Sequence, residues 1–182
     1  MSDPSRSPAG RARLLGVDPG LRRTGYALLS FDARQQADLL EAGVVRLDHT
    51  DRIERRLVEL ERSIAELIES HHPSVLACEQ LYAHYSHPRT AILMSHARGV
   101  ILMVAARCGM DVVNVGATHA KKMLTGNGHA SKTQVQRAVA MTLGLAAPPS
   151  PPDVADAIAI GLCGWRLRAA RRRATTAEAG VS

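Results

Sequence analysis

The stretch LLGVDPGLRRTGYALLSF, residues 14–31, gives the strongest indication of the fold. Two apolar runs, at 14–18 and 25–31, flank the turn-forming pair Pro19-Gly20, and a third apolar run follows at 42–47 after a polar loop. Short apolar runs bounded by turn residues are typical of strands. Short connections between strands favour antiparallel pairing, because parallel strands need a long crossover. We therefore predict a three-stranded antiparallel meander at the start of the fold.

Helical spacing follows the meander. Apolar residues recur at steps of three and four between charged residues, which predicts an amphipathic helix that Pro73 ends. These apolar residues are Ile53, Leu57, Leu60, Ile64, Leu67 and Ile68. The remaining predicted elements are a strand at 75–78, a helix at 89–108, a strand at 111–115, helices at 118–124 and 131–143, and a last helix from residue 153. A meander followed by such crossovers predicts an α/β fold, in which parallel strands extend a mixed five-stranded sheet flanked by helices.

A chain of 182 residues is expected to form one domain. Residues 1–12 are rich in Ser, Pro, Gly and Arg, so we expect a disordered leader there and the folded domain at 13–167. The apolar pattern fades after Trp165 into a segment rich in Arg and Ala. Residues 168–182 are therefore expected to form a basic flexible tail.

Charge and cysteine content narrow the function classes. The formal net charge of +6 favours a polyanionic partner, although the Arg-rich C-terminal segment supplies much of the excess. Cys78, Cys108 and Cys163 are far apart and form no C-x-x-C pair, which argues against a zinc site or a disulfide framework. This pattern fits a reducing, cytoplasmic location. We see no signal peptide and no apolar run that should span a bilayer, so no membrane association is expected.

Four carboxylates occupy positions where predicted strands end or a helix begins. Asp18 ends the first strand and Glu79 ends the strand at 75–78. Asp153 and Asp156 are three residues apart near the start of the last helix, a spacing that places them on one helix face. Taken singly, each has an ordinary explanation. Asp18 can start a turn, Asp153 can form a capping box with Ser150, and Glu79 can form a salt bridge.

Taken together, the four carboxylates point to a metal site. In the predicted fold the first strand neighbours the Glu79 strand, and the last helix packs across both. Carboxylates gathered in this way repel one another unless a cation is present. An all-oxygen ligand set suits Mg²⁺ or Mn²⁺ rather than zinc. Two such ions per site would stabilise the attacking and leaving oxygens in phosphodiester cleavage.

Five segments in order resemble the motifs of the RuvC family of Holliday-junction resolvases. They are GVDPGLRRTGYAL, VLACEQLY, ARG at 97–99, ASKTQVQRAV and PPDVADAIAI, and they span residues 14–162. The resemblance implies a ribonuclease H-like fold and a homodimeric, Mg²⁺-dependent endonuclease. Such an enzyme nicks opposed strands of four-way junction DNA and works with RuvA and RuvB. It further implies that Asp18, Glu79, Asp153 and Asp156 are the catalytic metal ligands.

The resemblance also suggests DNA-binding residues. Lys121 and Lys132 match its basic positions near the cleaved backbone, and Tyr82 falls where the family usually has Phe, so it could stack on an unpaired base. Ordinary readings remain open: the lysines could be solvated helix residues, and Tyr82 a core or rim aromatic. After Tyr82 the stretch AHYSHPRTAIL departs from the family pattern. Its His84 and His87 are three apart and could bind a metal, but loop histidines are commonly solvated.

The helix at 89–108 is a candidate for part of a dimer contact, and simple core packing explains its apolar residues equally well. The residues concerned are Ile92, Met94, Val100, Ile101 and Met103. Three other functions compete with the main interpretation. They are an RNA-processing nuclease of the YqgF type, an actin-like ATPase or sugar kinase, and a junction-binding module without catalysis. The ATPase class needs a much longer, two-lobed chain.

Overall fold

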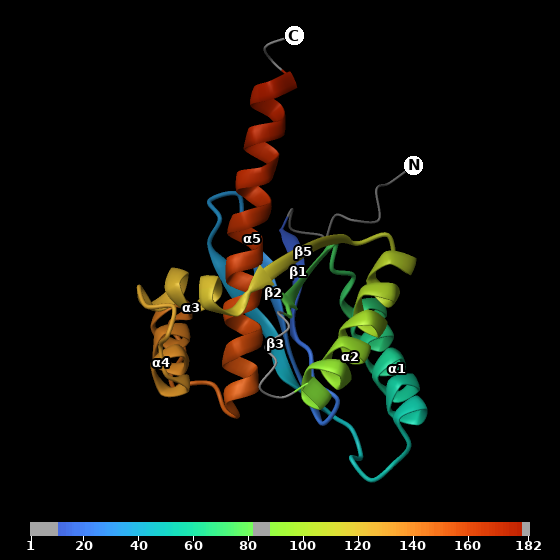
Figure 1. The fold of residues 1–182 in the computed structure, drawn as a ribbon. Helices are drawn as coiled ribbons and strands as arrows, with labels where there is room; N and C mark the ends of the chain where they lie inside the picture. Colours follow the sequence, from blue (N-terminus) through green and yellow to red (C-terminus); the bar gives the residue numbers. More distant parts are fainter. Residues whose placement is uncertain (1–10, 82–87, 180–182) are drawn as a thin grey trace.

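The computed structural model describes residues 11–81 and 88–179, which form a sheet flanked by helices (Figure 1). The strands are β1 (Ala12–Asp18), β2 (Arg23–Phe31), β3 (Ala37–Arg46), β4 (Val75–Gln80) and β5 (Asp111–Gly116). The helices are α1 (Ile53–His71), α2 (Pro88–Arg107), α3 (Ala117–Thr125), α4 (Lys132–Leu143) and α5 (Pro152–Ala179). The order of elements along the chain is the predicted one.

The strands form one five-stranded sheet in the order β3-β2-β1-β4-β5. β1 pairs antiparallel with β2, and β2 pairs antiparallel with β3, which confirms the meander. β4 and β5 add on as parallel strands beside β1. The central strand β1 is covered on both faces, since its successive residues Leu14 and Leu15 point to opposite sides and both are fully buried. This explains why β1 is a continuous apolar run rather than an alternating one.

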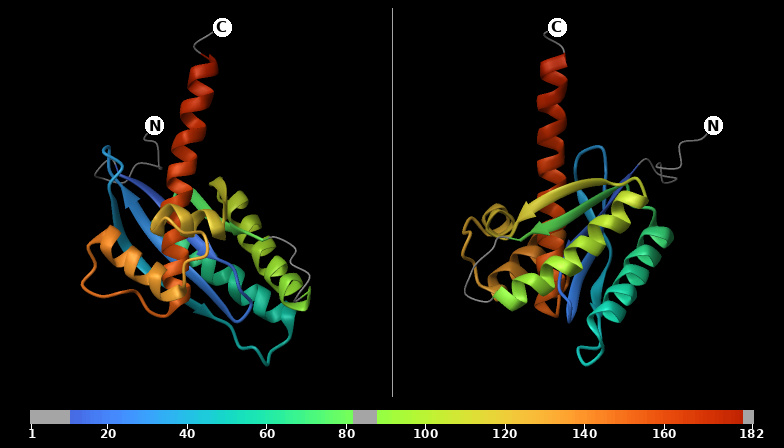
Figure 2. Two further views of the ribbon diagram at one scale, coloured as in Figure 1. Left: turned by 60° about the vertical axis from the view of Figure 1, so that its left-hand side comes forward. Right: turned by 45° about the vertical axis from the view of Figure 1, so that its right-hand side comes forward.

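The helices lie in two layers, one on each face of the sheet (Figure 2). α5 crosses one face with α3 and α4 beside it, and their apolar side chains form a core with Leu14, Leu29 and Val113. α1 and α2 cover the other face, over a second core that includes Leu15 and Leu76. The predicted amphipathic helix and the predicted helix start at Ser131 are both confirmed. Ser131 and Gln134 form a reciprocal capping box there.

Glycines let α5 lie directly on the backbone of the sheet. A Cβ atom at Gly16 would lie 2.5 Å from the carbonyl oxygen of Ala157 and 2.9 Å from the Cα atom of Gly161. A Cβ atom at Gly25 would collide with the carbonyl oxygen of Asp153. Larger residues at these positions would push the helix away from β1 and β2. The start of α5 is therefore held against the ends of these strands by contacts between backbones.

Two elements extend further than the sequence predicts. β3 begins at Ala37 rather than at residue 42, because residues 37–41 also pair with the end of β2. α5 continues to Ala179, so residues 168–179, which the sequence predicts as part of a basic flexible tail, are helical. The apolar pattern does fade after Trp165, but Ala and Arg both have high helix propensity and need no buried face to continue the helix.

Helix α2 is more apolar than expected. By length and composition alone, Arg89–Arg107 could cross a membrane, whereas the sequence prediction found no such run. One helix of this kind is weak evidence for a membrane span. In the fold, α2 packs against α1 and approaches β5.

Candidate metal centre and nucleic-acid interface

Asp18 and Glu79 stand at the ends of neighbouring parallel strands. β1 and β4 are in register up to Val17 and Cys78, so the two acidic residues that follow emerge side by side. The Asp18 side chain forms a hydrogen bond with Glu79. Burial, then this hydrogen bond and the negative charge of Glu79, raise the pKa of Asp18 well above its ordinary value of 3.8. Asp18 therefore keeps its proton to a higher pH than an exposed aspartate would.

Asp153 and Asp156 approach the same place from the first turns of α5. The negative charges of both residues contribute to the raised pKa of Asp18. The pKa of Asp156 is itself raised, mainly by burial, and the charges of Glu79 and Asp153 act in the same direction. The fold thus brings together all four carboxylates that the sequence singles out, although they lie more than 130 residues apart along the chain at the extremes.

Lysine and arginine side chains lie near the four carboxylates but do not pair with all of them. Lys121 of α3 and Lys132 of α4 are close enough to Asp156 for their charges to oppose the rise of its pKa. Arg23 lies at the edge of the site, with 3.9 Å between its guanidinium and the carboxylate of Asp153. Among the ion pairs of the described residues, none involves Asp18 or Glu79. The ordinary reading of Glu79 as half of a salt bridge is therefore not supported.

The loop after Asp18 is tied down by buried polar groups. The hydroxyl of Thr24, which is fully buried, donates to the carbonyl oxygen of Gly20 at 2.6 Å and accepts from the Gly20 amide at 3.2 Å. Arg56 of α1 is also buried, and its guanidinium donates to the carbonyl oxygen of Leu21. These bonds satisfy loop groups that water cannot reach. They also hold the backbone next to the Asp18 carboxylate in one position.

Arg98 is a positioning residue that sequence reasoning missed. The ARG segment was recognised only as a recurring run, without a role for its arginine. In the structure, Arg98 Nε donates to the carbonyl oxygen of Glu79 at 2.9 Å, and Arg98 Nη2 donates to Asn114 Oδ1 at 2.5 Å. The side chain thereby braces the ends of β4 and β5 against α2. An arginine within an apolar helix must find polar partners, and this signal was available in the sequence.

The donor types fit a hard divalent cation, and the four carboxylates lie near one another without being close enough to hold an ion jointly. Among the described residues, no three His, Cys, Asp or Glu side chains lie close enough to hold an ion. Burial, the hydrogen bond with Glu79 and the negative charges of the other three carboxylates instead raise the pKa of Asp18. Four carboxylates without a thiol or imidazole are the donors that Mg²⁺ and Mn²⁺ prefer. Binding a cation would release the proton and remove the repulsion.

A cationic groove adjoins the carboxylates. It has a volume of about 860 Å³ and touches Asp18 and Asp153. Its cationic lining comes from Arg22, Arg23, Arg56 and Arg89. Guanidinium groups beside a carboxylate cluster suit a phosphate backbone that enters from this side. Tyr82, His84 and His87 lie outside the described residues, so the predicted stacking aromatic and the two histidines are not placed.

Comparisons with known proteins agree with this geometry. Residues 14–164 match the family model described as "Crossover junction endodeoxyribonuclease RuvC". A protein of that description from Rhodopirellula baltica is 47% identical over 160 residues, which cover 88% of this chain and 89% of the relative. The solved structure "Thermus thermophilus RuvC structure" has a TM-score of 0.74 and 29% identity, and covers 83% of this chain and 92% of that one.

A second solved structure contains nucleic acid. It is described as "T. thermophilus RuvC in complex with Holliday junction substrate", with a TM-score of 0.74, 26% identity, and coverage of 83% of this chain and 91% of that one. The structural likeness confirms the predicted ribonuclease H-like fold. The family match decides against the RNA-processing and ATPase alternatives. The chain therefore belongs to the RuvC family of crossover junction endodeoxyribonucleases.

Proposed function

We propose that this chain resolves four-way DNA junctions by paired, symmetric nicking, using Mg²⁺ held by Asp18, Glu79, Asp153 and Asp156. The chain is a phosphodiester-hydrolysing endonuclease, and its family is metal-dependent and acts in recombination and repair. The observation that carries the proposal is that the neighbouring strand ends bearing Asp18 and Glu79 meet the start of α5, where the negative charges of Glu79, Asp153 and Asp156 add to the rise in the pKa of Asp18. The arginine-lined groove beside them supports a phosphate-containing substrate.

The carboxylates serve first to attract and hold the cations. Two bound Mg²⁺ ions, or Mn²⁺ in their place, would supply a hydroxide nucleophile at neutral pH and neutralise the departing 3′-oxygen. Asp18 would give up its proton when cations bind, because their positive charge would outweigh the burial and the negative charge of Glu79 that raise its pKa. Family resemblance implies products with 5′-phosphate and 3′-hydroxyl ends, which a ligase can seal.

Lys121 and Lys132 are proposed to hold the DNA phosphate at the site. Their proximity to Asp156 supports this role, because a phosphate bound beside the carboxylates would lie within reach of both ammonium groups. Lys132 is exposed and Lys121 is half-buried. Neither ammonium group is buried so deeply that it needs the Asp156 carboxylate to neutralise it. A lysine at such a place acts as a point charge on phosphate rather than a bidentate clamp.

Tyr82 is proposed to stack on a base that unpairs as the junction opens. Aromatic–base stacking contributes about 1–3 kcal/mol per base. Replacing Tyr82 with Ala should therefore slow the cleavage of closed junctions more than that of nicked or pre-opened junctions. Single-turnover rates on matched pairs of substrates measure the difference. Equal slowing on both substrates would remove Tyr82 from junction opening.

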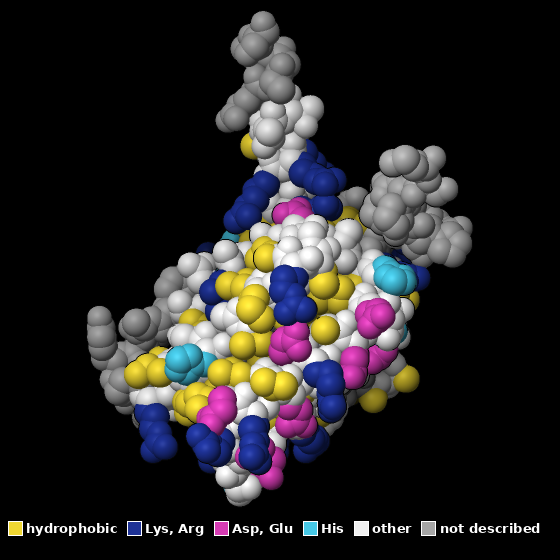
Figure 3. All heavy atoms as spheres, turned by 90° about the vertical axis from the view of Figure 1, so that its right-hand side faces the viewer, with side chains coloured by type: hydrophobic (Ala, Val, Ile, Leu, Met, Phe, Trp, Pro, Cys, Tyr) yellow, Lys and Arg dark blue, Asp and Glu magenta, His cyan; other side chains and the backbone are white. Residues whose placement is uncertain are grey.

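Helix α2 is proposed to form part of a homodimer contact. It is strongly apolar, yet only 22% of its most apolar stretch is buried. Ile92 and Met103 are 58% and 47% exposed, and hydrophobic side chains are visible between charged ones on the face that carries α1 and α2 (Figure 3). Ile101, in contrast, belongs to the core. A two-fold dimer would match the two-fold arrangement of a junction and so explain paired cuts. Sedimentation of the purified chain tests this proposal.

Family resemblance also leads us to propose RuvA and RuvB as partners and the cytoplasm as the location. The thiols of Cys78, Cys108 and Cys163 are all free, which suits a reducing compartment. Burial raises the pKa of the Cys78 thiol to about 12, so this residue stays a neutral core side chain at physiological pH.

The proposed function is tested with a synthetic four-way junction incubated with Mg²⁺, with Ca²⁺ or with no metal. We expect symmetric, ligatable nicks with Mg²⁺, no nicks without metal, and binding without comparable cutting in Ca²⁺. Linear duplex and structured RNA of similar length are the controls. An uncut junction that binds normally in Mg²⁺ would identify a module without catalysis. Faster cleavage of the RNA would also contradict the proposal.

A further inference from the structure

The C-terminal part of α5 leaves the body of the protein as a projecting helix (Figures 1 and 2). We call residues 166–173 of this helix the basic arm. It contains five arginines: Arg166, Arg168, Arg171, Arg172 and Arg173. Seen from the side of α1, Lys and Arg side chains gather where the helix emerges, whereas charges of both signs alternate over the body below (Figure 3).

The base of the basic arm is held in a fixed direction. Trp165 stacks on Phe31 with ring centroids 4.3 Å apart, and its indole donates to Gln35 Oε1 at 2.7 Å. Arg168 pairs with Asp111 at 2.7 Å and lies 5.4 Å from the centroid of the Trp165 ring. These contacts tie the helix to the β2–β3 hairpin on one side and to β5 on the other. Arg168 is therefore engaged in anchoring the helix.

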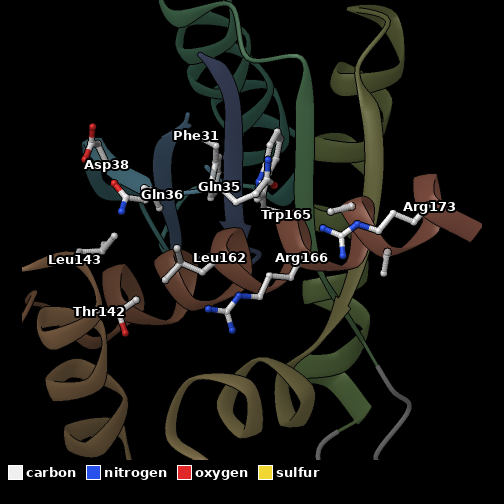
Figure 4. Close-up of a pocket in the computed structure, with 13 residues that line it drawn as sticks. Phe31, Gln35, Gln36, Asp38, Thr142, Leu143, Leu162, Trp165, Arg166 and Arg173 are labelled. Atoms are coloured by element: carbon white, nitrogen blue, oxygen red, sulfur yellow. The ribbon is translucent and has the colours of Figure 1, made fainter. Parts of the chain in front are cut away.

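An open pocket of about 630 Å³ lies between the basic arm, the β2–β3 hairpin and the end of α4 (Figure 4). Arg166 and Arg173 line it from α5, with Ala169 and Ala170 between them. The spacing of these four residues at steps of three, one and three puts them on one face of the helix. The two alanines leave room between the two guanidinium groups. One helix face thus presents two cations with an open space between them.

The rest of the pocket lining is mixed: apolar side chains such as Phe31, Leu162 and Trp165 stand beside polar ones, and its one acid is already paired. Gln36 and Thr142 offer amide and hydroxyl groups at its exposed rim. Asp38 is the one acidic residue that lines it, and this carboxylate already pairs with Arg11 at 2.7 Å. Arginine, glutamine and threonine side chains are the groups that proteins commonly use to contact phosphate oxygens.

The remaining arginines of the basic arm lack acidic partners in the part of the chain that the structure describes. None of the ion pairs found there involves Arg166, Arg171, Arg172 or Arg173. Adjacent like charges on one helix repel one another, and a polyanion would remove that repulsion and release its own counterions. The charge of the arm therefore fits a nucleic-acid backbone better than a protein surface of mixed charge.

We propose that Arg166, Arg173 and the pocket between them bind the phosphate backbone of a duplex arm of the junction, remote from the carboxylates. The proposal rests on the junction-cleaving function. Asp156 and Arg173 are 17 residues apart on one helix, so the second contact lies about 26 Å from the metal site at about 1.5 Å per residue. At about 3.4 Å per base pair, a duplex arm must extend roughly 8 base pairs from the cut to reach Arg173.

The test compares two junctions, one with arms of about 15 base pairs and one with hairpin-closed arms of about 5 base pairs. The short arms span about 17 Å, so they reach Arg166, 10 residues or about 15 Å from Asp156, but not Arg173. The test variant is Arg166→Gln with Arg173→Gln. The matched control is Arg171→Gln with Arg172→Gln, which removes the same charge from other faces of the same helix. Fluorescence anisotropy in Ca²⁺ at several salt concentrations measures binding, and single-turnover assays in Mg²⁺ measure cleavage.

We expect the test variant to bind the long-armed junction about three- to tenfold more weakly, with a salt dependence lower by about two phosphate contacts. The control variant should lose clearly less affinity for the same junction. On the short-armed junction the test variant should lose clearly less affinity than on the long-armed one, because only Arg166 is within reach, and the control variant should match the wild type. Cleavage of that substrate by the wild type tests the proposed function separately from the arm contact.

Three results would overturn the proposal. Unchanged binding of the long-armed junction by the test variant would mean that the arm is not a DNA surface and serves another partner. Equal losses for the test and control variants would indicate that DNA responds to the net positive charge of the helix rather than to the face that carries Arg166 and Arg173. An equal loss on the short-armed junction would place the effect at the metal site instead.

Discussion

The two ends of α5 carry opposite charges in opposite surroundings. Near its start, Asp153 and Asp156 are partly buried against the ends of β1 and β2 and join two further carboxylates. Toward its end, Arg171, Arg172 and Arg173 are exposed on a helix that has left the sheet (Figure 2). The acidic end is crowded by packing, whereas the basic end is separated from the body and surrounded by water.

This difference shows how one helix can gather like charges in two ways. At the acidic end, close contact of backbones holds the carboxylates near one another in a partly buried place, and burial, with their mutual repulsion added, raises the pKa values of Asp18 and Asp156. At the basic end, water screens the repulsion, so the arginines need no compensation until a polyanion arrives. The acidic end should therefore be sensitive to single substitutions, and the basic end should respond mainly to changes in substrate and salt.

The largest effect is expected when the acidic cluster loses one charge. Asp18→Asn keeps the shape of the side chain but removes a ligand charge, so cleavage should fall by roughly a thousandfold or more, a loss at or beyond the upper end for a single electrostatic group. Junction binding, measured in Ca²⁺, should persist because the groove arginines remain. Near-normal cleavage by this variant would remove Asp18 from the reaction.

A smaller loss is expected when a cation beside the cluster is removed. Lys132→Ala should slow cleavage by about tenfold to a hundredfold, since a hydrogen bond from a charged group contributes about 1.5–3 kcal/mol. Lys122→Ala is the matched control, because Lys122 is an exposed lysine of α3 outside the cluster. Circular dichroism should show both variants folded. An unfolded Lys132→Ala protein would point to a structural role instead.

The close contact between α5 and the glycines of the sheet can be disturbed without changing any charged residue. Gly16→Val should place methyl groups against the carbonyl of Ala157 and lower the free energy of unfolding by about 1–3 kcal/mol through overpacking. Cleavage should fall as well, because the start of α5 would move away from Asp18. Gly99→Ala is the control, since no atom lies within 4 Å of the new methyl group. Equal free energies of unfolding for the two variants, measured with urea, would contradict a close contact between α5 and Gly16.

The smallest effect is expected on the melting temperature of the metal-free protein, as a function of pH. Asp18 has a raised pKa when folded, so the folded state binds more protons than the unfolded state once the pH exceeds 3.8. The contribution of Asp18 to stability is therefore lost as the pH rises through the folded pKa. In EDTA near pH 8, Asp18→Asn should melt a few degrees higher than the wild type, at roughly 2–4 °C for each kcal/mol relieved.

The same comparison at about pH 2.8, roughly one unit below the ordinary pKa of 3.8, supplies the control for this prediction. Near that pH the Asp18 carboxyl is largely protonated in both the folded and the unfolded chain, so the two proteins should melt at similar temperatures. Thermal unfolding followed by circular dichroism measures both conditions. A difference between the proteins that does not change with pH would show that the proton on Asp18 is not its cause.

Much of the fold followed from local sequence signals. The meander, the amphipathic helix and the start of α4 were predictable because apolar runs bounded by turn residues, helical spacing and the Ser131 cap are encoded within a few residues. The full length of α5 was not predictable from the apolar pattern, because the part of the helix beyond the sheet has no buried face. Its helical state depends on propensity and on continuation from the packed part of the helix.

The residues of the candidate site also fall into those that the sequence could identify and those that it could not. Asp18 and Glu79 could be identified because each interrupts a buried run at the end of a strand, and the spacing of Asp153 and Asp156 places them on one helix face. Arg98, Thr24 and Arg56 could not be assigned roles, because their partners are backbone carbonyl groups of distant or looped segments. No sequence pattern specifies which carbonyl group a side chain will reach.

The sequence by itself determined which residue types are available for chemistry, where the strands and most helices lie, and the family to which the chain is similar. Only the tertiary structure decided that α5 rests on glycines of β1 and β2, and that one helix joins a carboxylate cluster to an exposed row of arginines. The physical reason is range. Propensity and periodicity act over neighbouring residues, whereas charge repulsion, burial and backbone contact depend on distances that exist only after the chain has folded.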